Sequence, residues 1–218
     1  MTMRVDVVTI FPELFELPLR TSIIGRAAEQ VGMRVVRTFL GAHAIPPAVS
    51  HDAYVESIID EMLPAVAGEA DACDVFCDAG FFSLQDAERI LAAAGRHGLA
   101  PRLHAEQLAR TGATELGIRL GATSVDHLEH LDPAGVAALA SSGTVATLLP
   151  GPALLLGGSL PPARALLDAG ATVALATDAN AGTWGAWSLA TAIGLGAVAL
   201  QMTLAEAVAA VTSGGAAA

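Results

Sequence analysis

Four side chains that can bind a metal ion or transfer a proton each follow a short apolar run. His43 follows "RTFLGA", His104 follows "PRL", His127 follows "TSVD" and Asp178 follows "VALAT". Neutral imidazole suits zinc or iron, and a carboxylate can act both as a ligand and as a base. A lone histidine is more often structural than functional, but the same placement repeated four times favours a shared site.

The apolar runs before these side chains belong to a regular alternation of predicted strands and helices. The strand candidates are "RVDVVTI", "MRVVRTFL", "CDVFC", "PRLH", "TSVDHL", "GTVATLL" and "TVALATD". The helix candidates between them are "PELFELPLRTSIIGRAAEQ", "DAYVESIIDEMLPAVA", "SLQDAERILAAAGRHG", "LARTGATELGIRLG", "PAGVAALASSG" and "PPARALLDAG". Gly98, Gly121 and Gly170 stand at helix C-cap positions. Repeated βα units predict a parallel sheet, and in a parallel barrel the C-terminal strand ends carry the active site.

Length and composition limit the fold and its partners. The 218 residues suit one large domain but are short for a complete eight-stranded barrel of ~250 residues. Hydrophobic residues make up 53% of the chain and charged residues 15%, so we expect a sizeable core. The net charge of −11 argues against a nucleic-acid partner, which Lys and Arg would have to bind. The N-terminus shows no secretory signal pattern, so we expect a cytoplasmic protein.

Two further features have structural explanations. Cys73 and Cys77 form a lone C-x3-C, a poor zinc signature, and are read as small apolar residues of a strand. The chain between Asp178 and Glu206 carries no charge over more than the ~20 residues of a spanning helix. Its first third is rich in Asn, Gly, Thr and Trp, so we predict a buried segment and no membrane partner.

Several longer segments resemble one enzyme family. "RTFLGAHAIPP", "DVFCDAGFFSLQDAERIL", "LHAEQLARTGATELGIRLGATSVDHLEHLD", "GTVATLLPG" and "ATDANAGT" resemble imidazolonepropionases, which are metal-dependent amidohydrolases. The resemblance runs from about Arg34 to the C-terminus. It implies an α/β fold: an incomplete (β/α)8 TIM-type barrel whose units resemble strands three to eight, preceded by one extra βα unit.

The resemblance also implies a reaction and residue roles. One divalent ion, zinc or iron, would activate water to open the ring of 4-imidazolone-5-propanoate to N-formimidoyl-L-glutamate, a step of histidine degradation. His104 and Asp178 would be metal ligands, and Asp178 would also accept the proton of the attacking water. His127 would polarise the carbonyl. The positions expected to face the substrate are His43, Gln107, Asn180, Gly182 and Thr183, and Glu106 is the alternative to Gln107 as a catalytic residue.

The sequence departs from that family at its N-terminal end. Imidazolonepropionases use an H-x-H ligand pair, and no H-x-H occurs in this chain. Residues 1–32, with "DVVTIFPELFE" and "SIIGRA", instead resemble the start of bacterial tRNA (guanine-N1)-methyltransferase. We therefore expect a strand-helix segment of foreign origin over 1–32 and a partial amidohydrolase barrel over 33–218, whose open edge favours self-association. A catalytically inactive chimera and a methyltransferase-related protein are the alternative hypotheses.

Overall fold

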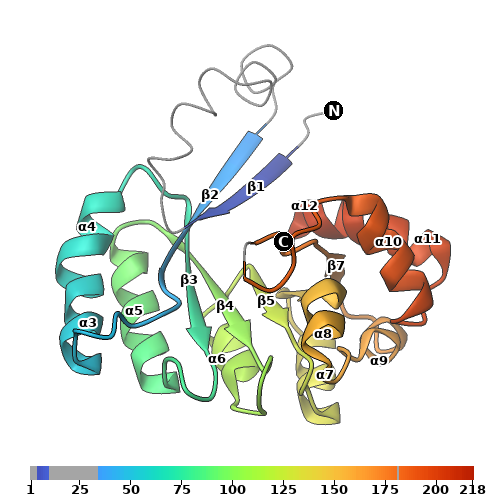
Figure 1. The fold of residues 1–218 in the computed structure, drawn as a ribbon, viewed down its shortest axis with the longest axis horizontal. Coiled ribbons are helices and arrows are strands. Elements are labelled where there is room, and N and C mark those ends of the chain that lie inside the picture. Colours follow the sequence, from blue (N-terminus) through green and yellow to red (C-terminus); the bar gives the residue numbers. More distant parts are fainter. Residues whose placement is uncertain (1–3, 10–33, 181) are drawn as a thin grey trace. The chain divides into compact units, whose positions relative to one another are not determined.

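The computed structural model describes residues 4–9, 34–180 and 182–218. The chain divides into two compact units, whose helices and strands are labelled in Figure 1. The first comprises Met1–Val75 and Arg89–Ala100, and the second comprises Phe76–Glu88 and Pro101–Ala218. The helix predicted over 12–30 lies outside the described residues.

The strands confirm the βα interpretation of the sequence. They are β1 (Arg4–Thr9), β2 (Arg34–Ala42), β3 (Ala72–Cys77), β4 (Ala100–Ala105), β5 (Ser124–His127), β6 (Val145–Leu148) and β7 (Val173–Leu175). In the first unit β1 pairs with β2, and β2 with β3, all parallel. In the second unit β4, β5, β6 and β7 pair in chain order, again all parallel. The extra strand β1 therefore precedes six strands, β2 to β7, at the predicted positions.

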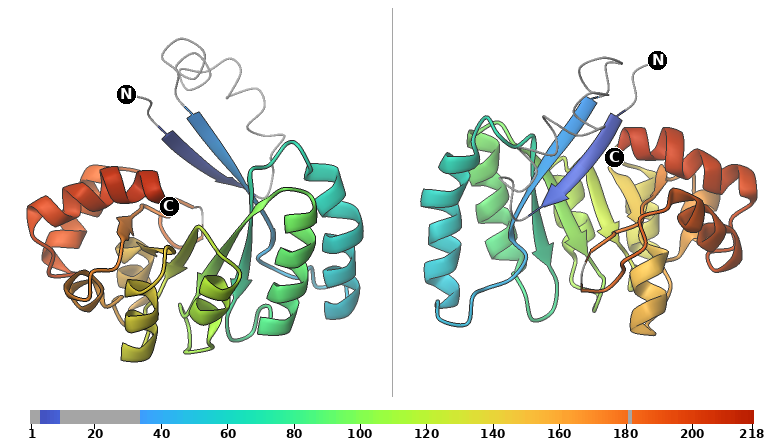
Figure 2. Two further views of the ribbon diagram at one scale, coloured as in Figure 1. Left: turned by 180° about the vertical axis from the view of Figure 1, so that it is seen from behind. Right: turned by 45° about the horizontal axis from the view of Figure 1, so that its top comes forward.

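The helices of the first unit pack beside one another. The predicted helix over 52–67 is observed as α3 (His51–Ser57), the π-helix η1 (Ile58–Met62) and α4 (Leu63–Val66), followed along the chain by α5 (Leu84–Arg96), which contributes to both units. Figure 2 shows α3 running beside α5, where Nη2 of Arg89 donates to Oε1 of Glu56 at 2.5 Å. The buried side chains of these elements form the core of this unit: Val55, Ile58, Leu63 and Ile90.

The helices of the second unit include both predicted and unpredicted elements. The predicted ones are α6 (Ala113–Arg119), α7 (Pro133–Ala140) and α9 (Ala163–Asp168). The others are α8 (Pro150–Leu156), α10 (Leu189–Val198), α11 (Leu204–Ala209), the π-helix η2 (Ala210–Gly214) and α12 (Gly215–Ala217). Helix and strand side chains interleave in the core of this unit: Leu103, Leu116, Val125, Leu139, Leu148 and Leu166.

The ends of the helices explain why they begin and stop where they do. Asp132 caps α7 by accepting a hydrogen bond from the Gly135 amide at 2.8 Å, and Pro133 fits the first turn, where its missing N–H costs nothing. Gly98, Gly121 and Gly170 have φ values of 79°, 68° and 85°, as their predicted cap positions require.

The C-terminal helices pack closely on β7. A Cβ built on Gly214 of η2 would lie 2.1 Å from the Val173 carbonyl oxygen, so this approach requires glycine. The uncharged stretch before Glu206 contains only the ten-residue α10 and the start of α11. Within residues 4–9, 34–180 and 182–218, no helix is long and apolar enough to cross a membrane.

Candidate functional site

In the first unit, the candidate residue His43 lies beside a buried carboxylate. His43 directly follows β2, and Asp74 lies in the middle of β3. Nε2 of His43 is 3.7 Å from Oδ2 of Asp74, whose side chain is 2% exposed. An Asp so deeply buried must be paired or hydrogen-bonded to be tolerated. The pair is therefore a polar centre inside an otherwise apolar strand region.

The end of β2 is anchored next to this pair. The hydroxyl of Tyr54, on α3, donates to the Gly41 carbonyl at 2.9 Å, two residues before His43. Burial raises the pKa of the Tyr54 hydroxyl above its ordinary value, so this group stays a donor at neutral pH. The hydrogen bond restrains the segment from which the imidazole projects.

In the second unit, two predicted histidines lie close together with their rings tilted. His104 is near the end of β4 and His127 ends β5, and the strand register pairs Ala105 with His127. The imidazole centroids are 4.9 Å apart with planes at 52°. Phe76 packs against His104, with centroids 5.6 Å apart. Parallel pairing thus brings two histidines to the C-terminal ends of neighbouring strands, as the sequence predicts.

The backbone at these strand ends is strained. Glu106, His127, Leu128 and Asp178 are non-glycine residues with φ values of 53°, 80°, 71° and 48°. Left-handed backbone at such residues is uncommon and costs roughly 1–3 kcal/mol each, and it concentrates at functional sites. Each of the four follows or ends a strand of the second unit. These are four of the five such residues in the described part of the chain, and the fifth, Gln201 (φ 57°), lies between α10 and α11.

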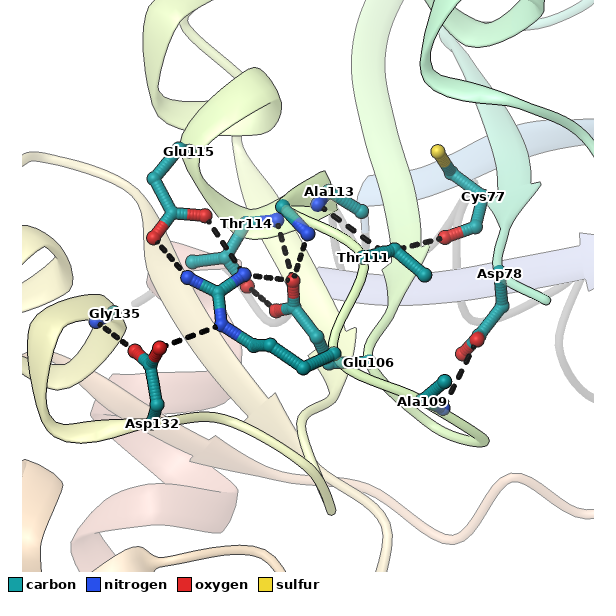
Figure 3. Close-up of polar contacts among 12 residues, drawn as sticks. Cys77, Asp78, Glu106, Ala109, Thr111, Ala113, Thr114, Glu115, Asp132 and Gly135 are labelled. Carbon is teal, nitrogen blue, oxygen red and sulfur yellow. Dashed lines mark hydrogen bonds and ion pairs between the residues drawn. The ribbon is translucent and has the colours of Figure 1, made fainter.

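The Glu106 side chain makes hydrogen bonds within its own loop (Figure 3). It is fully buried, and its Oε1 accepts from Arg110 Nη1 at 2.6 Å and from the Gly112 amide at 3.0 Å. The Thr114 hydroxyl donates to Oε2. Gln107, the next residue, is half-buried. The adjacent side chains of Glu106 and Gln107 therefore lie in different surroundings.

His127 has a second ionisable neighbour that was not predicted. Nδ1 of His127 lies 3.5 Å from Oε1 of Glu129, and the two side chains are 2% and 4% exposed. Burial raises the pKa of the Glu129 carboxyl group to about 7. Near neutral pH this carboxyl group therefore exchanges a proton readily beside the imidazole.

The predicted residues after Asp178 form one hydrogen-bonded turn. Oδ1 of Asn180 accepts from the amides of Gly182 and Thr183 at 2.8 and 2.7 Å. Nδ2 of Asn180 donates to the Asp178 carbonyl at 2.8 Å and to Oγ1 of Thr183 at 3.0 Å. The Asn180 side chain thus shapes the loop that leaves Asp178, which is itself half-buried.

Three buried acidic residues are not among the predicted site residues: Asp74, Asp78 and Glu129. Asp74 lies within the predicted apolar strand "CDVFC", where an acidic residue is itself a signal, since buried strands rarely hold one. Asp78 and Glu129 are also buried, at 4% and 8% exposure. Their burial depends on chain segments far away in the sequence, so no local pattern indicates it.

The donor types present suit a divalent metal ion. His and Asp side chains are donors that zinc or iron accepts: the first unit carries His43 and Asp74, and the second carries His104. The cysteines do not extend it. Cys73 and Cys77 are free and buried, and burial raises the pKa of both thiols, that of Cys77 to about 12. Thiols bind metals as thiolates, so these two are best explained as strand packing residues.

Comparison with known proteins identifies imidazolonepropionases as relatives. No protein-family model matches the chain. Imidazolonepropionase of Bacteroides fragilis is 42% identical over 210 residues, which cover 94% of this chain and 50% of that protein. That of Paraburkholderia phymatum is 46% identical over 196 residues, covering 86% of this chain and 48% of that protein. The chain thus spans about half the length of these relatives.

Solved structures show the fold. An adenosine deaminase from Xanthomonas campestris with bound zinc matches with a TM-score of 0.69 at 20% identity, over 99% of this chain and 52% of that one. N-isopropylammelide isopropylaminohydrolase from Burkholderia multivorans matches with a TM-score of 0.69 at 19% identity, over 98% and 58%. The fold is therefore a partial TIM-type amidohydrolase barrel.

The N-terminal resemblance has no such support. The Bacteroides match covers 94% of the chain, so it reaches into residues 1–32. None of the relatives described above is a methyltransferase. The resemblance of this segment to tRNA (guanine-N1)-methyltransferase is therefore unsupported.

Proposed function

We propose that this homologue of imidazolonepropionases is a metal-dependent hydrolase that opens the ring of 4-imidazolone-5-propanoate. The observation that carries the proposal is the His104 and His127 pair. The two imidazole rings lie 4.9 Å apart near the ends of β4 and β5, where the backbone of Glu106, His127 and Leu128 is left-handed. The chain that carries them is 42% identical to an imidazolonepropionase over most of its length. Two histidines at strand ends are the kind of group that a hydrolytic site needs.

In the proposed site, His104 and Asp178 would hold the metal ion. A bound zinc or iron ion supplies a Lewis acid, which lets water act as a nucleophile near neutral pH. The Asp178 carboxylate accepts a proton from the attacking water. Its left-handed backbone and the Asn180 hydrogen bond to its carbonyl fix the start of the loop that carries it.

His127 would act on the other reactant. Its ring N–H donates to the carbonyl oxygen of the substrate and stabilises the negative charge that develops there as water adds to the carbonyl carbon. The ring C–N bond at that carbon then breaks, and the proton held by Asp178 passes to the leaving nitrogen. This gives N-formimidoyl-L-glutamate without any other reactant than water. We assign substrate contacts to His43, Gln107, Asn180, Gly182 and Thr183, and keep Glu106 as the alternative catalytic group to Gln107.

One observation favours a second candidate, a chain that binds no metal and has no activity. The sequence lacks the H-x-H pair that imidazolonepropionases use. Structural metal sites in proteins usually need four ligands, and catalytic sites need three plus water. If the purified chain supplies fewer than three ligands, it does not retain a metal ion.

Metal analysis and turnover together separate the two candidates. The purified chain is dialysed and assayed for zinc and iron by elemental analysis, and ring opening is followed by ultraviolet absorbance. We expect about one ion per chain and measurable turnover, both lost in His104→Asn and retained in His97→Asn, an exposed control. A metal-free, inactive wild-type chain would establish the second candidate. Sedimentation of the same sample tests the expected self-association.

A further inference from the structure

The segment between β4 and α6 is held on one side by a buried carboxylate. Oε1 of Glu106 accepts hydrogen bonds from the amides of Gly112 at 3.0 Å and Thr114 at 3.4 Å, at the start of α6. Its Oε2 accepts from the Thr114 hydroxyl, and Arg110 Nη1 lies 2.6 Å from Oε1. These donors compensate for the complete burial of the carboxylate.

A second buried carboxylate holds the same segment from β3. Asp78 follows the last residue of β3 and is 4% exposed. Its Oδ2 accepts from the Leu108 amide at 2.8 Å, and its Oδ1 accepts from the Ala109 amide at 3.1 Å. These two amides directly follow Gln107. The Gln107 backbone is thus fixed on both sides, by Glu106 before it and by the Asp78 contacts after it.

Arg110 extends the network to the next loop. Besides Glu106, its guanidinium contacts Glu115 on α6 and, through Nε at 3.0 Å, Oδ2 of Asp132. Asp132 caps α7 through the Gly135 amide and lies in the loop that follows His127. Figure 3 shows the carboxylates of Glu106, Glu115 and Asp132 on one side of the loop and Asp78 on the opposite side. One side chain therefore joins the loop after β4 to the loop after β5.

We infer that Glu106, Asp78 and Arg110 are positioning residues, which together hold Gln107 beside His104 and couple its loop to that of His127. This inference rests on the proposed function as far as Gln107 touches substrate. A purely local role, capping α6, explains the bonds of Glu106 to Gly112 and Thr114. It does not explain the Asp78 bonds at Leu108 and Ala109 or the Arg110 contact with Asp132.

Amide hydrogen exchange tests the network without relying on activity. The variants are Asp78→Asn and Arg110→Met, and the control is Arg119→Met, which removes an Arg from an exposed pair with Glu88 at 3.2 Å. We expect exchange at Leu108 and Ala109 to rise about tenfold or more in Asp78→Asn, because a bond to a charged acceptor is lost. Arg110→Met should raise exchange at both Gly112 and Gly135, while the control leaves all four amides unchanged.

Kinetics then separate this inference from the proposed function. If the wild-type chain turns over substrate, Arg110→Met should lower kcat/KM about tenfold or more with unchanged metal content, since positioning and metal binding are different tasks. If the wild-type chain is inactive, the proposed function fails, and the exchange data alone decide whether the network exists.

Unchanged exchange at Gly135 in Arg110→Met overturns the coupling of the two loops. Unchanged exchange at Leu108 and Ala109 in Asp78→Asn overturns the role of Asp78. If a variant unfolds globally before the local exchange of these amides can be measured, Glu106→Gln is measured in its place, because this substitution keeps the shape of the side chain.

Discussion

Nδ1 of His127 lies 3.5 Å from Oε1 of Glu129, and both side chains are almost completely buried. Within the described residues, neither oxygen of the Glu129 side chain accepts a hydrogen bond of normal geometry. A buried carboxyl group with so little compensation favours its neutral form, and the backbone at His127 and Leu128 is left-handed. The pair combines an ionisable contact with backbone strain, both of which concentrate at functional sites.

Replacing Glu129 by Gln should remove part of the pH dependence of stability. Burial raises the folded pKa of Glu129 to about 7 from the usual 4.5, so the folded chain holds a proton that the unfolded chain loses. The contribution of Glu129 to the free energy of unfolding is fully present below pH 4.5 and is lost as pH rises through 7. The wild type should therefore lose stability relative to Glu129→Gln by on the order of 3 kcal/mol across this range. Urea unfolding of both proteins at pH 4.5, 6 and 8 measures this, and parallel curves would refute it.

Removing single donors should show which residues hold a metal ion. We expect His104→Asn and Asp178→Asn to reduce bound zinc or iron by about tenfold or more at a fixed free metal concentration, because each removes a proposed ligand. His43→Asn and Asp74→Asn test whether the pair in the first unit binds a metal ion on its own. Elemental analysis after dialysis against a metal buffer gives the result, with His130→Asn, an exposed histidine, as the matched control. Equal metal content in His104→Asn and wild type would contradict the assignment.

The His43 and Asp74 pair should also be visible in the free energy of unfolding. Nε2 of His43 lies 3.7 Å from Oδ2 of the buried Asp74, so removal of either side chain removes an ionisable contact of the other. We expect His43→Ala and Asp74→Ala each to lower stability by about 1–3 kcal/mol in the metal-free protein. The double variant should lose less than the sum, by about 0.5–3 kcal/mol, as contacting residues do. Strict additivity in urea unfolding would mean that the two do not interact.

Local patterns predicted the strands well because each is a short run of mostly apolar residues. They predicted His104 and His127 for the same reason, since position after a strand is a local property. They missed α8 and α10, because "PGPALLLGG" and "LATAIGLGAV" lack a polar face that would show helical period. The choice between Glu106 and Gln107 as the catalytic residue depends on the left-handed backbone at Glu106, which the sequence "HAEQ" does not reveal.

The contact between η2 and β7 gives a test of the C-terminal packing. A Cβ on Gly214 would lie 2.1 Å from the Val173 carbonyl oxygen, a backbone atom that cannot rotate away. Gly214→Ala should therefore lower the free energy of unfolding by about 1–3 kcal/mol, because η2 must move off the strand. The matched control is Gly194→Ala in α10, where a Cβ meets no atom within 4 Å. That change should be neutral or stabilising by up to about 1 kcal/mol, since Ala favours helix over Gly. Thermal and urea unfolding of both variants measure the difference, and equal stabilities would show that η2 does not pack on β7 as closely as the structure has it.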